Sequence, residues 1–153
     1  MNRKPVLNVG LVLAGLLVVA ASAYAAGYQL GNVGAGGYDV VSYFTEGKAV
    51  RGTGWHVAVH QGTTYLFASK ANRKQFAESP EQYLPQFGGY CAFGAAMGKK
   101  FYADPTVWKI VDGKLYMNLD NKIQKKWAGN LSENLEKGYA NRPKIQHSAP
   151  EGI

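Results

Sequence analysis

Few side chains in this sequence could bind a metal ion or act as a nucleophile. Cys91 is the only cysteine, and a thiolate is both a nucleophile and a soft metal ligand. His56 and His60 stand four positions apart, and Met97 follows Cys91 by six positions. Because thiolate and thioether ligands select Cu(I), Cys91 and Met97 are candidate ligands for copper, and the two histidines could add nitrogen ligands.

Each of these residues also has a structural interpretation. Cys91 and Met97 could simply be buried apolar residues. The alternation of Trp55, Val57 and Val59 with polar or small residues predicts a strand. Two residues four apart on a strand are separated by roughly 13 Å, so His56 and His60 would not share one ion. We interpret His60 as a turn residue and leave both interpretations open for His56, which we expect to face Phe67.

Patterns of other functional classes are missing from the sequence. It has no phosphate-binding loop, no dinucleotide fingerprint and no paired carboxylates, and no motif supports a catalytic pair of Cys91 with His56. The formal net charge is +7, but the basic residues are scattered along the chain, whereas nucleic-acid binding needs them clustered on one surface. We therefore expect a binding protein rather than an enzyme, and no nucleic-acid partner.

Residues 1–25 have the three parts of a signal peptide. Arg3 and Lys4 precede an apolar run, and Ala23-Tyr24-Ala25 ends it with the small residues that signal peptidase accepts. Cleavage after Ala25 would remove both charges and lower the net charge from +7 to +5. We expect a periplasmic or secreted protein; an uncleaved segment would instead attach it to a membrane. Residues 26–36 are glycine-rich and are predicted to form a flexible leader.

The rest of the chain predicts a small α+β domain of two antiparallel hairpins with short packed helices. One hairpin is expected over 55–68 with Gln61-Gly62 at its turn, and the other over 108–119 with Asp112-Gly113. Further signals predict helices after Ser69, Ser79 and Asp120, and a tight loop leading into a short helix over 87–100. We find no internal repeat, and we expect a loose tail over 140–153.

Several segments together resemble the YHS-domain proteins of bacteria, over residues 37–139. The matching segments are Gly37–Phe44, Gly62–Ser69, Asn72-Arg73, Phe76, Pro80–Ala92, Asp104-Pro105, Trp108 and Asp112–Tyr116. The resemblance implies kinship with small metal-associated modules, the TRASH group, whose cysteines bind copper or similar ions. Where those modules carry cysteines, this sequence has Val41-Ser42 and Ala68, so Cys91 is the remaining candidate.

From the residues and the resemblance together we predict a metal-binding or metal-handling module outside the cytoplasm. Its metal ion is expected to be copper, as Cu(I), in preference to zinc. Cys91 is the principal ligand, His56 its favoured partner, and Met97 and His60 are further candidates. One cysteine per chain also suggests a site shared across a homodimer. The alternatives are a metal-free module that binds a small molecule or a protein, and a thiol redox protein that uses Cys91.

Overall fold

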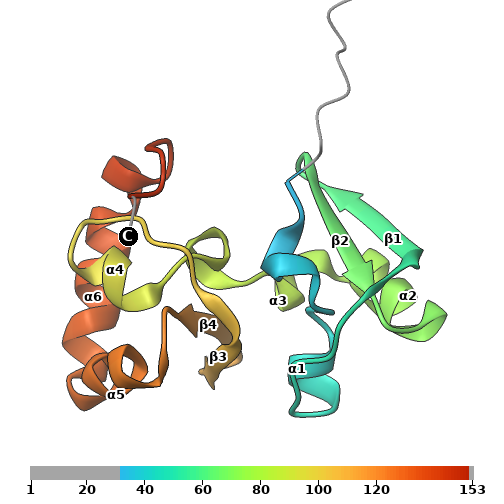
Figure 1. Ribbon diagram of the computed structural model, residues 1–153, viewed down its shortest axis with the longest axis horizontal. Helices are drawn as coiled ribbons and strands as arrows, with labels where there is room; N and C mark the ends of the chain where they lie inside the picture. The colour runs from blue at the N-terminus through green and yellow to red at the C-terminus, as the bar shows by residue number, and fades with distance from the viewer. Residues whose placement is uncertain (1–31, 152–153) are drawn as a thin grey trace, which may run out of the picture. The chain divides into compact units, whose positions relative to one another are not determined.

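The computed structural model describes residues 32–151, and the predicted signal peptide lies outside this range. Figure 1 shows the elements, which confirm an α+β fold of two antiparallel hairpins and short helices. In chain order they are η1 (Gly34–Gly37), α1 (Ser42–Thr45), β1 (Thr53–His60), β2 (Thr63–Phe67), α2 (Lys70–Glu78), α3 (Pro80–Tyr83), η2 (Gln86–Gly89), α4 (Ala92–Ala96), β3 (Asp104–Val111), β4 (Lys114–Asn118), α5 (Asn121–Gly129) and α6 (Leu131–Ile145).

The turns of both hairpins lie where the sequence predicts them. Gln61 and Gly62 have φ values of 48° and 76°, and Asp112 and Gly113 have 49° and 71°. Two successive positive φ angles are typical of the type I′ turn, whose twist matches that of the flanking strands. Glycine in the second position adopts this conformation without steric cost, which explains why both tight turns form.

The helices after each hairpin begin at the predicted caps. Ser69 accepts a hydrogen bond from the backbone N–H of Asn72, and Asp120 accepts one from Ile123. Such caps satisfy a backbone donor that the first helical turn leaves free. In Figure 1, α2 lies beside the first hairpin and α5 beside the second, while α6 lies against α4.

The described part of the chain contains an internal structural duplication, so our expectation that the sequence has no repeat is wrong. A 3-10 turn, a short helix, a hairpin and a capped helix follow one another from 34 to 78 and again from 86 to 129. β1 begins at Thr53 and β3 at Asp104, 51 residues later. Both hairpins break register at the same place, between Thr53 and Val57 and between Asp104 and Trp108.

Side-chain packing repeats with the same spacing. The rings of Tyr65 and Phe76 lie 5.0 Å apart at 38°, and those of Tyr116 and Trp127 lie 5.3 Å apart at 41°. Each pair joins the second strand of a hairpin to the helix that follows it. The two copies therefore share a packing scheme as well as an order of elements.

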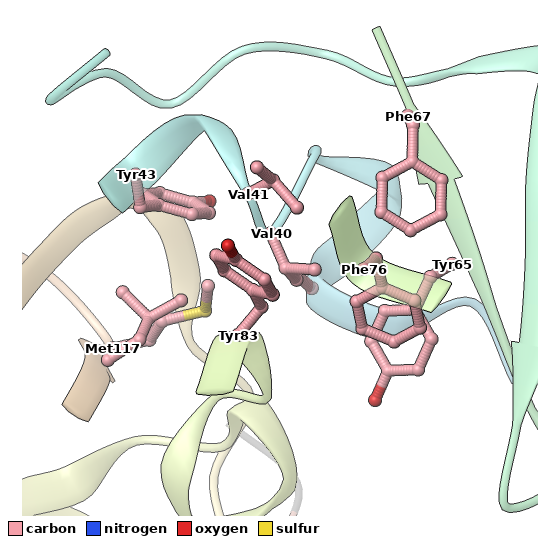
Figure 2. Close-up of a cluster of buried hydrophobic side chains, with 10 residues drawn as sticks. Val40, Val41, Tyr43, Tyr65, Phe67, Phe76, Tyr83 and Met117 are labelled. Carbon is pink, nitrogen blue, oxygen red and sulfur yellow. The ribbon is translucent and has the colours of Figure 1, made fainter. Parts of the chain in front are cut away.

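A single core cluster contains residues of both copies. Leu115 and Met117 of β4 are buried in it with Val40 and Phe76 of the first copy and with Tyr83 of α3, which lies between the copies. Figure 2 shows Met117 beside Tyr83, and Phe76 against Tyr65 and Phe67. Tyr43 contributes an edge-to-face contact with Trp108 at 5.1 Å, and its hydroxyl donates to the Pro105 carbonyl at 2.9 Å. The two copies thus stabilise one another through shared apolar packing.

Two predicted segment boundaries differ from the structure. Residues 32–36, assigned to the flexible leader, bridge Val33 to Thr64 and bury Ala35. The tail expected from Ala140 is helical as far as Ile145, because α6 continues across Pro143. Within residues 32–151, no helix has the length and apolar character needed to cross a membrane.

Candidate binding site around Cys91

Cys91 lies at the start of α4, directly after the glycine-rich turn η2. Its side chain is 3% exposed. Sγ accepts a hydrogen bond from the Gly94 N–H at 3.4 Å and donates one to Asn118 Oδ1 at 3.7 Å. The Cys91 backbone is fixed as well, because its N–H donates to the Phe101 carbonyl and the residue bridges to Met117. The thiol is therefore held in a defined position just below the surface.

The first copy of the duplication has Asp39 at the position of Cys91, 52 residues earlier. Asp39 is fully buried. Its carboxylate accepts hydrogen bonds from the backbone N–H groups of Val41 and Ala68 and from the Asn72 amide, at 2.7–2.9 Å. Hydrogen bonds to an ionised acceptor are among the stronger ones in proteins, so Asp39 joins three segments of the first copy.

Cys91 lacks the partners that make Asp39 a structural residue. The residues 51 positions after Ala68 and Asn72 are Leu119 and Ile123. Neither forms a hydrogen bond with Cys91; both instead line a hollow beside it. A polar junction in the first copy is thus replaced by a thiol next to an apolar hollow in the second.

This apolar hollow has a volume of about 280 Å³. It is lined by Cys91, Phe93, Gly94, Met97, Phe101, Leu119, Ile123 and Lys126. Met97 follows the last residue of α4 and is 58% exposed. Because the methionine side chain has three rotatable bonds, its thioether can adjust to a ligand held by the thiol. Two of the four predicted ligands, Cys91 and Met97, therefore line the same hollow.

A second hollow of about 180 Å³ also has Cys91 in its lining, and its other lining residues come mainly from η2, α4 and the end of α6. We call it the basic hollow; it is lined by Phe87, Gly88, Tyr90, Cys91, Ala95, Lys99, Lys100, Arg142, Ile145 and Gln146. Burial raises the pKa of the Tyr90 hydroxyl above its usual value, and the neighbouring Tyr102 adds to the rise. Tyr90 therefore stays neutral at physiological pH and adds no negative charge beside Lys99, Lys100 and Arg142.

The two histidines lie in the first copy, and neither lines either hollow. His60 ends β1, and its Nε2 contacts Glu81 Oε1 at 2.9 Å. His56 lies in the irregular part of β1 between Thr53 and Val57. The expected pairing of His56 with Phe67 is wrong, because the bulge brings Thr53 opposite Phe67. Neither histidine is placed beside Cys91 as a partner.

Sequence reasoning missed Asn118. This residue is fully buried, and its Oδ1 accepts from the Phe93 N–H at 3.2 Å as well as from Cys91 Sγ. Its Nδ2 is buried without a hydrogen-bond partner, which is rare and costly in a folded protein. The matching residue of the first copy is the apolar Phe67. A polar residue in the last position of an otherwise buried strand was the available signal.

Comparison with known proteins identifies the first copy. Residues 41–87 match the family model of the YHS domain. The chain contains a YHS domain. This domain includes His56 and His60, whereas Cys91 and Met97 follow its matched residues. No curated protein and no solved structure was found to match the chain.

Ser42 and Ala68, two of the residues found where the resemblance implies metal-binding cysteines, do not fit a metal here. Ser42 Oγ donates to the carbonyls of Asp39 and Lys48, and the Ala68 N–H donates to Asp39. These residues are occupied by structural hydrogen bonds. Within residues 32–151, no three His, Cys, Asp or Glu side chains are grouped so that they could hold a metal ion. The Cys91 and Met97 pair is a different set of donors, soft and sulfur-only, which suits a soft monovalent ion.

Proposed function

We propose that this YHS-domain protein is a soft-metal-binding module that takes up Cu(I) through the Cys91 thiolate and the Met97 thioether. The observation that carries the proposal is that both sulfur side chains line one apolar hollow. Sulfur ligands select Cu(I) over the harder divalent ions. An apolar wall excludes water and so favours a singly charged, weakly hydrated ion over Zn(II).

The duplication supports a binding role for the thiol. In the first copy Asp39 is fully engaged in holding the fold together, whereas Cys91 makes only two weak hydrogen bonds. Because Cys91 contributes few hydrogen bonds to the fold and lines a hollow, its thiol is available to bind a ligand. The alternative of a thiol redox protein has less support, because neither His56 nor His60 lines a hollow with Cys91 and so neither could act as its catalytic base.

Export of the protein belongs to the same proposal. The charged start, apolar run and small residues of 1–25 favour a periplasmic or secreted location. A reducing cytosol would not be needed to keep the thiol free, since one cysteine per chain excludes an internal disulfide. In this setting Cu(I) is cargo that the module captures and passes on.

A competition titration tests the proposal. The chain without residues 1–25 is titrated with Cu(I) under anaerobic conditions against a chromophoric Cu(I) chelator. We expect Cu(I) to bind and the binding to be lost in Cys91→Ser. Met97→Leu should weaken it by at least about tenfold, the lower end of what even indirect metal partners contribute. One Cu(I) per two chains would show that the site is shared across a homodimer.

The chain offers a matched control. Met117 is 1% exposed in the shared core, and Met117→Leu conserves volume without touching the hollow. This variant should bind Cu(I) as the parent does, as should His56→Gln and His60→Gln. Parent-like Cu(I) binding by folded Cys91→Ser would disprove the proposal.

A further inference from the structure

The basic hollow combines an apolar interior with positive charge, and the proposed Cu(I) site does not use these charges. Lys99, Lys100 and Arg142 line it together with the rings of Phe87 and Tyr90. Lys99 and Lys100 follow α4, while Arg142 comes from the last turns of α6. Charges from separate parts of the chain therefore meet at one small cavity.

Lys99, Lys100 and Arg142 differ in the partners that they already have. Lys100 Nζ donates to the carbonyls of Gln146 and Ser148 and lies 4.5 Å from the centre of the Tyr90 ring. Lys99 pairs with a carboxylate. Arg142 forms no salt bridge with any residue in the range 32–151. A guanidinium that lines a hollow without a carboxylate is suited to bind one in two-point geometry.

The carboxylate on Lys99 comes from the chain's own C-terminal segment. Glu151 Oε2 lies 3.0 Å from Lys99 Nζ, and the Glu151 N–H donates to the Lys100 carbonyl. The segment after α6 thus turns back to the loop after α4 and brings an acidic group to the hollow's cations. This contact shows that a carboxylate can pair with a cation of the hollow.

We propose that the basic hollow binds a small organic carboxylate with a ring-sized apolar body. The carboxylate pairs with Arg142 and displaces Glu151 from Lys99, while the apolar body lies against Phe87 and Ile145. The size fits, because a cavity of about 150 Å³ already accommodates benzene and this hollow measures about 180 Å³. The site is separate from the apolar hollow and shares only Cys91 with it.

Benzoate is the probe for this site, and benzamide is its neutral counterpart of the same shape. Each is titrated into the ¹⁵N-labelled chain without residues 1–25, and amide chemical shifts are followed by NMR. We expect benzoate to shift the amides around Gly88, Lys99 and Arg142, with saturation. Benzamide, which lacks the charge, should bind up to about fivefold more weakly, since it loses the charge-assisted hydrogen bonds to an exposed guanidinium.

Single variants assign the roles. Arg142→Gln should lower benzoate affinity about three- to tenfold. This loss is smaller than that expected for a buried ion pair, because the Arg142 side chain is exposed. Glu151→Gln should raise the affinity, by up to about fivefold, because it removes the competing carboxylate from an exposed ion pair. Lys122→Gln removes an exposed cation of α5 that does not line the hollow and should leave the affinity unchanged.

Two outcomes would overturn the proposal. One is the absence of saturable shifts at the hollow with benzoate, and the other is an equal loss of affinity in Lys122→Gln and Arg142→Gln, which would indicate general attraction to a basic protein. Met97→Leu separates this site from the Cu(I) site, because Met97 lines the apolar hollow and not the basic hollow. It should weaken Cu(I) binding and keep benzoate binding, so either proposal can fail while the other holds.

Discussion

Asp39 and Cys91 occupy equivalent positions in the two copies of the repeat, but their side chains form different hydrogen bonds. The Asp39 carboxylate accepts hydrogen bonds from the Asn72 amide and from two backbone N–H groups, and the residue is fully buried. The Cys91 thiol has two long hydrogen bonds, and Cys91 lines two hollows. At the residue scale, one position is structural in the first copy and available for binding in the second.

Removing the two side chains should therefore affect stability very differently. Asp39→Ala leaves three buried donors without an acceptor, each costing about 1–3 kcal/mol, so we expect a loss of about 3–5 kcal/mol. Cys91→Ala should cost about 1 kcal/mol, within the range of ordinary substitutions. Urea unfolding at pH 7 measures both changes. Equal losses would contradict the assigned roles.

Tyr43 predicts a loss of stability at alkaline pH. Burial raises the pKa of its hydroxyl above the ordinary 10.0, with smaller contributions from Tyr38, Asp104 and Asp39. The folded state therefore keeps a proton that the unfolded state loses above pH 10. This contribution to stability is complete below pH 10 and decreases as the pH rises above it.

The comparison of the parent chain with Tyr43→Phe isolates this effect from the titration of lysines. The variant should lose about 1 kcal/mol at pH 7, because the hydrogen bond to the Pro105 carbonyl disappears. Its free energy of unfolding should then fall less steeply than that of the parent between pH 9 and about pH 11. Parallel profiles in urea unfolding would show that Tyr43 does not titrate abnormally.

At the scale of elements, the hairpin turns are where the two copies agree most closely. Gly62 and Gly113 have φ values of 76° and 71°, and a Cβ added at either would meet nothing within 4 Å. The cost of Gly62→Ala and of Gly113→Ala is therefore that of the left-handed backbone alone, about 1–2 kcal/mol. Thermal unfolding should give similar losses for both.

Gly54 provides the control for the turn variants. Its added Cβ also meets nothing within 4 Å, but its φ is not positive. Gly54→Ala should be neutral or stabilise the fold by about 0.4–1 kcal/mol, because alanine restricts the unfolded chain. A destabilisation as large as that of the turn variants would mean that something other than backbone conformation determines their cost.

These elements were predictable from the sequence because their signals are local. Both turns, the caps Ser69 and Asp120, and the short helix after Cys91 follow from neighbouring residues. The duplication was missed because few residues are identical between the copies. The clearest shared motif is Gly-Gly-Tyr at 36–38 and 88–90, while most core pairs differ in type, as Phe76 and Trp127 do.

The candidate site was predictable only in part, and for the same physical reason. Cys91 and Met97 are close in the sequence and joined by α4, so their proximity is a local property. Asn118 and Arg142 reach the site from β4 and α6, and their placement depends on packing between distant segments. His56 was misjudged because a bulge in β1 cannot be read from the alternation of residues.

At the scale of the whole described chain, the two copies form one cooperative structure. Leu115 of β4 is fully buried in a cluster with Val40, Val41 and Phe76 of the first copy. The second copy also has a core cluster of its own, formed by Ala92, Tyr116 and Trp127. The shared cluster nevertheless links the stability of the two hairpins, because residues of both copies bury their apolar surface in it.

Hydrogen exchange tests this coupling. Leu115→Ala should cost about 2–5 kcal/mol, the range for large-to-small changes in a core. The protection of amides in β1 and β2 should fall by the same amount as that in β3 and β4, since global unfolding limits both. A loss of protection restricted to the second hairpin would show that the copies unfold separately.

The central claim is that two sulfur atoms beside one hollow make the second copy a binding site. The X-ray absorption spectrum of the copper-loaded chain tests this claim directly, because it reports the atoms bound to the metal. We predict a first coordination shell of sulfur only, which loses one sulfur in Met97→Leu. A shell of nitrogen or oxygen, or a spectrum unchanged by replacing Cys91 with serine, would contradict it.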